Sequence, residues 1–132
     1  MDTKFTLGDI ISAKPEQIYK AWLSTQGHSD MTGSPASVES RVKGKFTAWD
    51  GYISGEILEL KPYRRIVQAW RTTEFPEGSP DLRVEITLEP VKEGTKVSIT
   101  HSNIPEGQAE DYKQGWQDYY FKPMKQYEFP KG

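Results

Sequence analysis

The chain contains 132 residues with a mass of 15.1 kDa, a length that suits one domain able to bury a substantial core. Its net charge of -2 and the lack of a long basic block argue against nucleic acid or an anionic membrane as a partner. It has no cysteine, so disulfides, thiol nucleophiles and cysteine-based metal sites are excluded. No secretory signal and no apolar run of the ~18 residues that a membrane helix needs is present, so we expect a cytoplasmic protein.

The N-terminal part predicts a strand followed by a short helix. Residues 3–11 alternate weakly between polar and apolar side chains, as a half-buried strand does. Pro15 suits the first turn of a helix, where its missing N–H costs nothing, and we expect this helix to end near Gly27. Residues 28–36 are rich in Gly, Ser and Pro and predict a loop with room for one further helical turn.

From residue 37 onward the pattern predicts a meander of about six strands. The clearest expected strands are residues 45–49, 52–60, 65–72, 82–89 and 95–102. Asp50-Gly51 predicts a hairpin turn, because both residues tolerate positive φ. Ile57 and Leu58 are adjacent apolar residues, which indicates a β-bulge. Alternation in the last two segments predicts one buried and one solvated face.

The last segment predicts one long amphipathic helix, from about Gln108 to Tyr127. Its expected apolar stripe consists of Ala109, Tyr112, Trp116, Tyr119, Tyr120, Pro123 and Tyr127. Pro123 predicts a local kink or an end of the helix, because it lacks a backbone donor. Such a helix needs a large apolar partner, and the upstream sheet supplies one. We therefore expect an α+β fold with a curved antiparallel sheet around the helix, and function in the space between them.

This order of elements, together with a set of short motifs, resembles the C-terminal-type domain of the activator of heat-shock protein 90 ATPase family. The motifs are Gly44-Lys45-Phe46, Asp50-Gly51, Ser54-Gly55-Glu56, Pro62, Ile66-Val67, Trp70-Arg71, Ile104-Pro105 and Gly115-Trp116-Gln117-Asp118-Tyr119-Tyr120-Phe121. The likeness covers residues 4–127, and we treat residues 1–132 as a single START-like domain.

The resemblance implies a helix-grip fold of the START-like, birch-pollen-allergen-like (SRPBCC) superfamily, with a hydrophobic cavity under the C-terminal helix. It implies a heat-shock protein 90 chaperone as a partner and brings no catalytic motif and no cofactor. The eukaryotic activators that this domain resembles carry a separate N-terminal domain with a Trp- and Asn-rich motif. We expect no counterpart of that domain within these 132 residues.

Large aromatic side chains are the main candidates for a ligand site in the cavity. Ligand pockets are concave and mostly apolar, and a few polar tips finish them. The candidates are Trp22, Phe46, Trp49, Trp70, His101, Trp116, Tyr120 and Met124. The alternative is that these side chains simply fill the core beneath the helix. Trp49, Tyr52 and Tyr63 near hairpin ends, beside Arg64 and Arg65, are further candidates for a protein-contact surface.

The sequence shows no catalytic or metal-binding constellation. His28 and His101 are the only histidines and lie far apart, without a metal-ligand spacing, a nucleophile elbow or a phosphate-binding loop. The alternative function is a cyclase or dehydratase acting on a hydrophobic polyketide-like substrate through His101, Tyr120 or an arginine. Its other acid–base candidates are Asp50, Glu56, Glu59, Glu85 and Glu89, with Arg71 or Arg83. The leading hypothesis is a non-enzymatic domain that contacts heat-shock protein 90 or holds a small hydrophobic molecule.

Overall fold

A seven-stranded antiparallel sheet forms one layer of the protein, in the order β1-β7-β6-β5-β4-β3-β2. The computed structural model describes residues 3–105 and 107–130. The strands are β1 Thr3–Ile11, β2 Ser37–Val38, β3 Lys45–Ala48, β4 Ile53–Lys61, β5 Arg65–Thr72, β6 Leu82–Val91 and β7 Gly94–Ile104. Only β1 joins out of chain order, by pairing with β7, so the chain from β2 to β7 is the predicted meander of six strands.

Two features of the β3–β4–β5 region were predicted from local chemistry and are confirmed. Asp50 and Gly51 both have positive φ, and the N–H of Tyr52 donates to the carbonyl of Trp49 at 3.1 Å to close the turn. The β4–β5 register shifts after Ile57, which leaves Leu58 as an exposed bulge residue.

The expectation of one helix from Pro15 to Gly27 is wrong, because the structure has two. Helix α1 is Pro15–Trp22. Helix α2 is Thr25–Thr32, and it extends into residues 28–36, where a loop with room for one helical turn was expected. Ser24 starts the second helix, since its Oγ accepts from the N–H of Gly27 at 3.0 Å. Gly27 lies inside α2, and a Cβ there would come within 2.8 Å of Ala21, so glycine permits close packing of the two helices.

The long C-terminal helix has three consecutive parts. Helix α3 is Ala109–Trp116, a π-helical turn covers Gln117–Phe121, and helix α4 is Lys122–Gln126. Pro123 therefore neither ends nor breaks the helix. The disturbance that it was expected to cause coincides with the π-helical turn just before it, in which the N–H of Lys122 donates to the carbonyl of Gln117.

The π-helical turn also corrects the predicted apolar stripe. Tyr119 was placed on the buried side, but 55% of it is exposed. Phe121, which a regular helix would turn away from the sheet, is buried. A π-helical turn contains about one more residue than an α-helical turn, so the residues after it face the sheet at other positions than a regular three- and four-residue spacing predicts.

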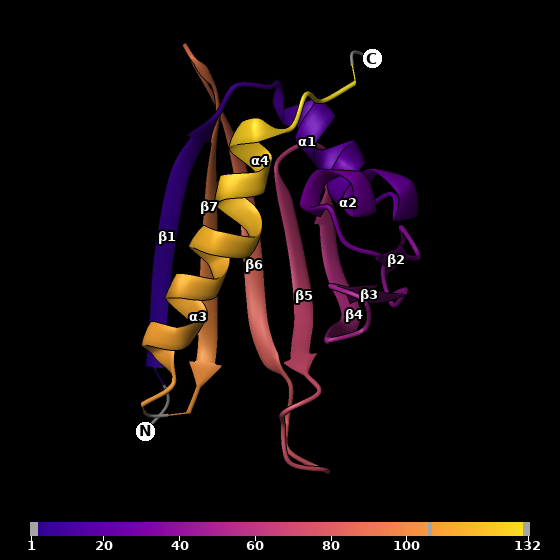
Figure 1. The fold of residues 1–132 in the computed structure, drawn as a ribbon, viewed down its shortest axis with the longest axis vertical. Coiled ribbons are helices and arrows are strands. Elements are labelled where there is room, and N and C mark those ends of the chain that lie inside the picture. The colour runs from indigo at the N-terminus through magenta and orange to yellow at the C-terminus, as the bar shows by residue number, and fades with distance from the viewer. Residues whose placement is uncertain (1–2, 106, 131–132) are drawn as a thin grey trace.

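The helices lie against one face of the curved sheet, as Figure 1 shows. The long helix lies over β1, β7 and β6, and α1 and α2 lie near its C-terminal end. Val84, Ile86, Val97 and Ile99 point into the core between the layers. The side chains between these positions point to the opposite face of the sheet. One of them, Glu85, forms an ion pair with Arg65. This is the predicted α+β helix-grip arrangement. Within residues 3–105 and 107–130, no helix is both long and apolar enough to cross a membrane.

Candidate functional site

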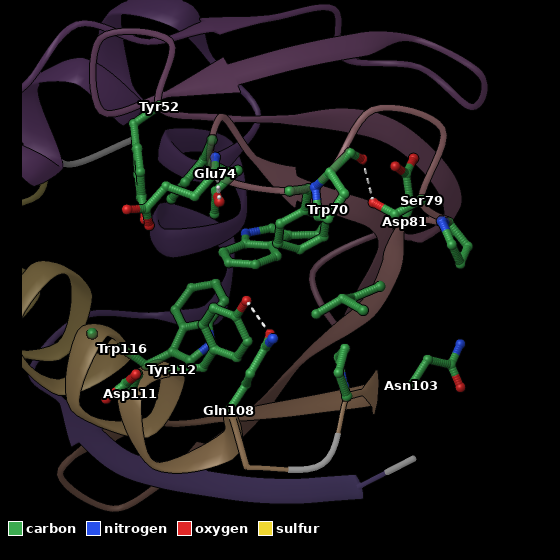
Figure 2. Close-up of a pocket in the computed structure, with 18 of the residues that line it drawn as sticks. Tyr52, Trp70, Glu74, Ser79, Asp81, Asn103, Gln108, Asp111, Tyr112 and Trp116 are labelled. Carbon is green, nitrogen blue, oxygen red and sulfur yellow. Dashed lines mark hydrogen bonds between the residues drawn. The ribbon is translucent and has the colours of Figure 1, made fainter. Parts of the chain in front are cut away.

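A cleft of about 1010 Å³ opens between α3 and the loop of residues 73–81 that joins β5 to β6 (Figure 2). Its lining includes the aromatic side chains Trp70, Phe75, Tyr112, Trp116, Tyr119 and Tyr120. The sheet contributes Trp70 through β5, the helix contributes four of these rings, and the loop contributes Phe75. The cleft thus lies where helix, sheet and loop diverge, beneath the N-terminal half of the long helix.

Two tryptophans form the inner wall of the cleft. The ring centroids of Trp70 and Trp116 lie 6.1 Å apart, and the ring of Tyr112 stands edge-on to Trp70 at 5.4 Å. Both indoles are almost fully buried, so their positions are fixed by packing. The result is a well-packed aromatic wall, of which a small part of each indole is exposed.

His101 holds this inner wall from behind. Trp116 donates its indole N–H to Nδ1 of His101 at 3.0 Å, and Tyr112 stacks on the imidazole at 5.1 Å. Because Nδ1 accepts, the neutral ring carries its hydrogen on Nε2, which has no hydrogen-bond partner among the described residues. Burial lowers the pKa of His101 to about 3, so the ring stays neutral at physiological pH.

His28 plays a corresponding part at the other half of the helix, although the sequence placed it in a loop. Its Nδ1 donates to the carbonyl of Trp22 at 2.8 Å, because a carbonyl can only accept. Its Nε2 must then accept from the hydroxyl of Tyr120, also at 2.8 Å. Burial lowers the pKa of His28 and raises the pKa of Tyr120. The serine at position 24, a good N-cap, was the sequence signal for the helix that carries His28.

Beneath the C-terminal half of the long helix, the space is filled. Tyr120 stacks on Trp22 at 5.0 Å, and Phe121, Met124 and Met31 are buried. Tyr120 borders both regions, since it also lines the cleft.

The structure divides the eight predicted cavity residues. Trp70, Trp116 and Tyr120 line the cleft. The remaining five do not contribute to its lining and are Trp22, Phe46, Trp49, His101 and Met124. Trp49 has positive φ in the β3–β4 turn, and its ring packs against Tyr119 at 5.0 Å.

The five carboxylates predicted as acid–base candidates lie outside the lining of the cleft, and Arg71 lies at its edge. Glu56 pairs with Lys45, and Arg65 bridges Glu59 and Glu85. Arg71 pairs with Asp81 at 2.7 Å. None of the five predicted acids lines the cleft.

Three other carboxylates do line the cleft, and sequence reasoning missed them. They are Glu74, Asp81 and Asp111. Two belong to an irregular loop whose course has no sequence period, and Asp111 lies outside the apolar stripe expected for the helix. In the part of the chain that the structure describes, no group of three or more His, Cys, Asp or Glu side chains could hold a metal ion.

The sheet, the gripped helix and the cleft define a START-like domain. The family model described as "Activator of Hsp90 ATPase homolog 1-like protein" matches residues 12–128. The chain belongs to this family, as its motifs predicted.

Individual relatives agree with this assignment. The human activator of 90 kDa heat shock protein ATPase homolog 1 is 33% identical over 123 residues, which are 93% of this chain and 36% of the relative. This chain thus spans about a third of the length of the curated relatives it matches.

Solved structures show the same arrangement of elements. An HSP90 activator from Plasmodium falciparum is 29% identical, with a TM-score of 0.81 over 90% of this chain and 91% of that one. A protein from Chromobacterium violaceum is 28% identical, with a TM-score of 0.72 over 93% and 95% of the two chains.

Proposed function

We propose that this chain is a protein-binding domain that contacts a heat-shock protein 90 chaperone. The observation that carries the proposal is the 33% identity to the human activator along 93% of this chain. The resemblance to the Plasmodium activator supports it, because that solved chain is covered almost entirely by a domain of this size.

The test is a titration of the purified chain against the host's heat-shock protein 90, read out as association and as ATPase rate. Saturable association supports the proposal, and a rise in ATPase rate would show that the domain alone activates the chaperone. If neither association nor stimulation occurs at high concentration, the proposal is wrong.

The contact surface that we propose is the turn between β4 and β5. Tyr63 is 39% exposed there, and its neighbour Arg64 is exposed, whereas Arg65 is held in ion pairs. An aromatic side chain next to an unshielded arginine is typical of energetically important protein contacts. Arg64→Glu should weaken association about tenfold or more, whereas Lys92→Glu in the exposed β6–β7 turn should not. Equal effects of the two reversals would exclude this surface.

A second candidate function is the binding of a small, largely apolar molecule in the cleft. The specific observation in its favour is a volume of about 1010 Å³ bounded by a well-packed wall of aromatic rings. Clefts of this size and composition are typical of small-molecule sites.

The alternative of a cyclase or dehydratase gains no support from the groups on which it depended. His101 lies behind Trp116, outside the cleft lining, and the hydroxyl of Tyr120 is bound to His28. Arg71 is paired with Asp81. A general acid or base must reach the proton that it transfers, and in this structure the candidate groups are engaged by partners within the protein.

A further inference from the structure

The cleft combines aromatic walls with an acidic rim. Its described lining includes Glu74, Asp81 and Asp111 but no lysine, arginine or histidine. Asp81 is neutralised by Arg71 at 2.7 Å. Among the described residues, no ion pair engages Glu74 or Asp111. The opening therefore carries two carboxylates that lack a basic partner.

These two carboxylates come from different walls. Figure 2 shows Glu74 on the side of the sheet and loop, and Asp111 on the helix. The hydroxyl of Tyr52 donates to Glu74 at 2.6 Å and so orients its carboxylate. Tyr112 lies within the field of both acids. Its pKa is raised mainly by burial and additionally by the negative charges of Glu74 and Asp111.

The chain already holds one of its own cations with the same combination of groups. At the edge of the cleft, the guanidinium carbon of Arg71 lies 5.4 Å from the ring centroid of Phe75 while the same side chain binds Asp81. An aromatic face and a carboxylate together stabilise a cation better than either does alone. At the cleft, the aromatic wall of Trp70 and Trp116 and the two unpaired acids of the rim offer the same two kinds of group, and the described lining holds no basic side chain.

We propose that the cleft binds an aromatic or amphiphilic organic cation. Its positive charge lies beside the carboxylates of Glu74 and Asp111, and its apolar body lies against the aromatic wall. An anion of the same shape is repelled by both acids, and a neutral analogue gains only the apolar contact. The inference rests on the second candidate function above and adds the charge of the ligand to it.

Three naphthalene probes of similar shape test the proposal. They are the cation (naphthalen-2-ylmethyl)trimethylammonium, the neutral naphthalen-2-ylmethanol and the anion naphthalene-2-sulfonate. Binding is followed by NMR at the indole N–H signals, with Trp70 and Trp116 as reporters of the cleft and Trp22 as a reporter of the filled region. We expect the cation to bind about fivefold more tightly than the neutral probe, and the anion more weakly than either.

The charge dependence is assigned with two double variants that change net charge equally. Glu74→Gln with Asp111→Asn removes the two cleft acids and should reduce the preference for the cation to less than about twofold. Glu77→Gln with Glu110→Gln is the matched control, because both residues are exposed, lie in the same loop and helix, and do not line the cleft. The control should keep most of the preference.

Three results would overturn the proposal. Equal affinity for the cationic and neutral probes would show that the cleft binds ligands without selecting their charge. An equal loss of the preference for the cation in both double variants would show that the preference depends on net charge and not on Glu74 and Asp111. If no probe shifts Trp70 or Trp116, the second candidate function fails as well. Association with heat-shock protein 90 is measured separately, so its failure would leave the cleft result standing.

Discussion

The two halves of the long helix do different work over the same sheet. Its C-terminal half, in the π-helical turn and α4, is packed against α1 and α2, and Phe121 and Met124 are buried there. Its N-terminal half, α3, instead forms one wall of an open cleft. A buried histidine ties each half to the rest of the protein, His28 through Tyr120 and His101 through Trp116. The comparison teaches that one helix can both fill a START-like cavity and line it.

The largest expected effect is on the filled half. Phe121→Ala should lower the free energy of unfolding by about 3–5 kcal/mol, because it opens a cavity where the surrounding side chains cannot collapse freely. Tyr119→Ala, two residues earlier, is the matched control and should cost less than about 1 kcal/mol, since that ring is 55% exposed. Urea unfolding of both variants checks the prediction. Similar losses would contradict the π-helical shift of the buried face.

Trp116→Ala tests the boundary of the cleft and should cost about 3 kcal/mol. The indole is buried and its N–H donates to His101, so its loss removes packing and leaves Nδ1 without a donor. One side of the ring already faces the cleft, which gives the neighbouring side chains and solvent room to adjust. A loss below about 1 kcal/mol in denaturant unfolding would show that Trp116 is not a core anchor.

Lowering the pH should destabilise the protein already at pH values well above those at which carboxylates become protonated. His101 has a pKa of about 3 when folded and 6.5 when unfolded, so the unfolded state binds the proton first. Stability from this group is complete above pH 6.5 and is lost as the pH falls toward 3. The loss at pH 5 is about 2 kcal/mol from His101, and His28 acts in the same direction.

Unfolding at a series of pH values measures this effect. His101→Gln should flatten the profile between pH 6.5 and 5 relative to its own stability at neutral pH, because one of the two titrating groups is gone. A wild-type profile that is flat across that range would contradict the neutral, buried state of both histidines.

The smallest effect compares one hydroxyl from each half. Tyr120→Phe removes the donor to His28 inside the core and should cost about 1–2 kcal/mol, because it leaves a buried acceptor unsatisfied. Tyr112→Phe removes an exposed hydrogen bond to Gln108 and should cost less than about 0.5 kcal/mol. Thermal unfolding of the pair is sufficient. A reversed order would mean that the two halves have been assigned wrongly.

Local chemistry explains which parts of this fold were predictable. Asp50-Gly51 predicted a turn because both residues tolerate positive φ, and the adjacent apolar residues Ile57 and Leu58 predicted a bulge because they interrupt the alternation of the strand. Both signals depend on only a few neighbouring residues. The family motifs predicted the helix-grip arrangement. The π-helical turn was not predicted, since Pro123 indicates only a local kink or an end, and a regular three- and four-residue spacing does not reveal an inserted residue.

The lining of the cleft was anticipated only in part, because it depends on contacts between residues that are distant in sequence. Trp70 and Trp116 were identified because they are large, apolar and on regular elements. Glu74 and Asp111 were not, since one lies in an irregular loop and the other at the edge of a polar helix face. The His28–Tyr120 hydrogen bond joins residues 92 positions apart, and no local pattern indicates such a contact.

The division of the helix into a filled and an open half is tested most directly by one NMR titration with neutral naphthalen-2-ylmethanol. The methyl groups of Met31 and Met124 report on the filled half, where both side chains are buried, and the indoles of Trp70 and Trp116 report on the cleft. We predict that the indole signals shift with saturation while both methyl signals stay in place. Methyl shifts as large as those of the indoles would show that the filled half is also open and would contradict the account.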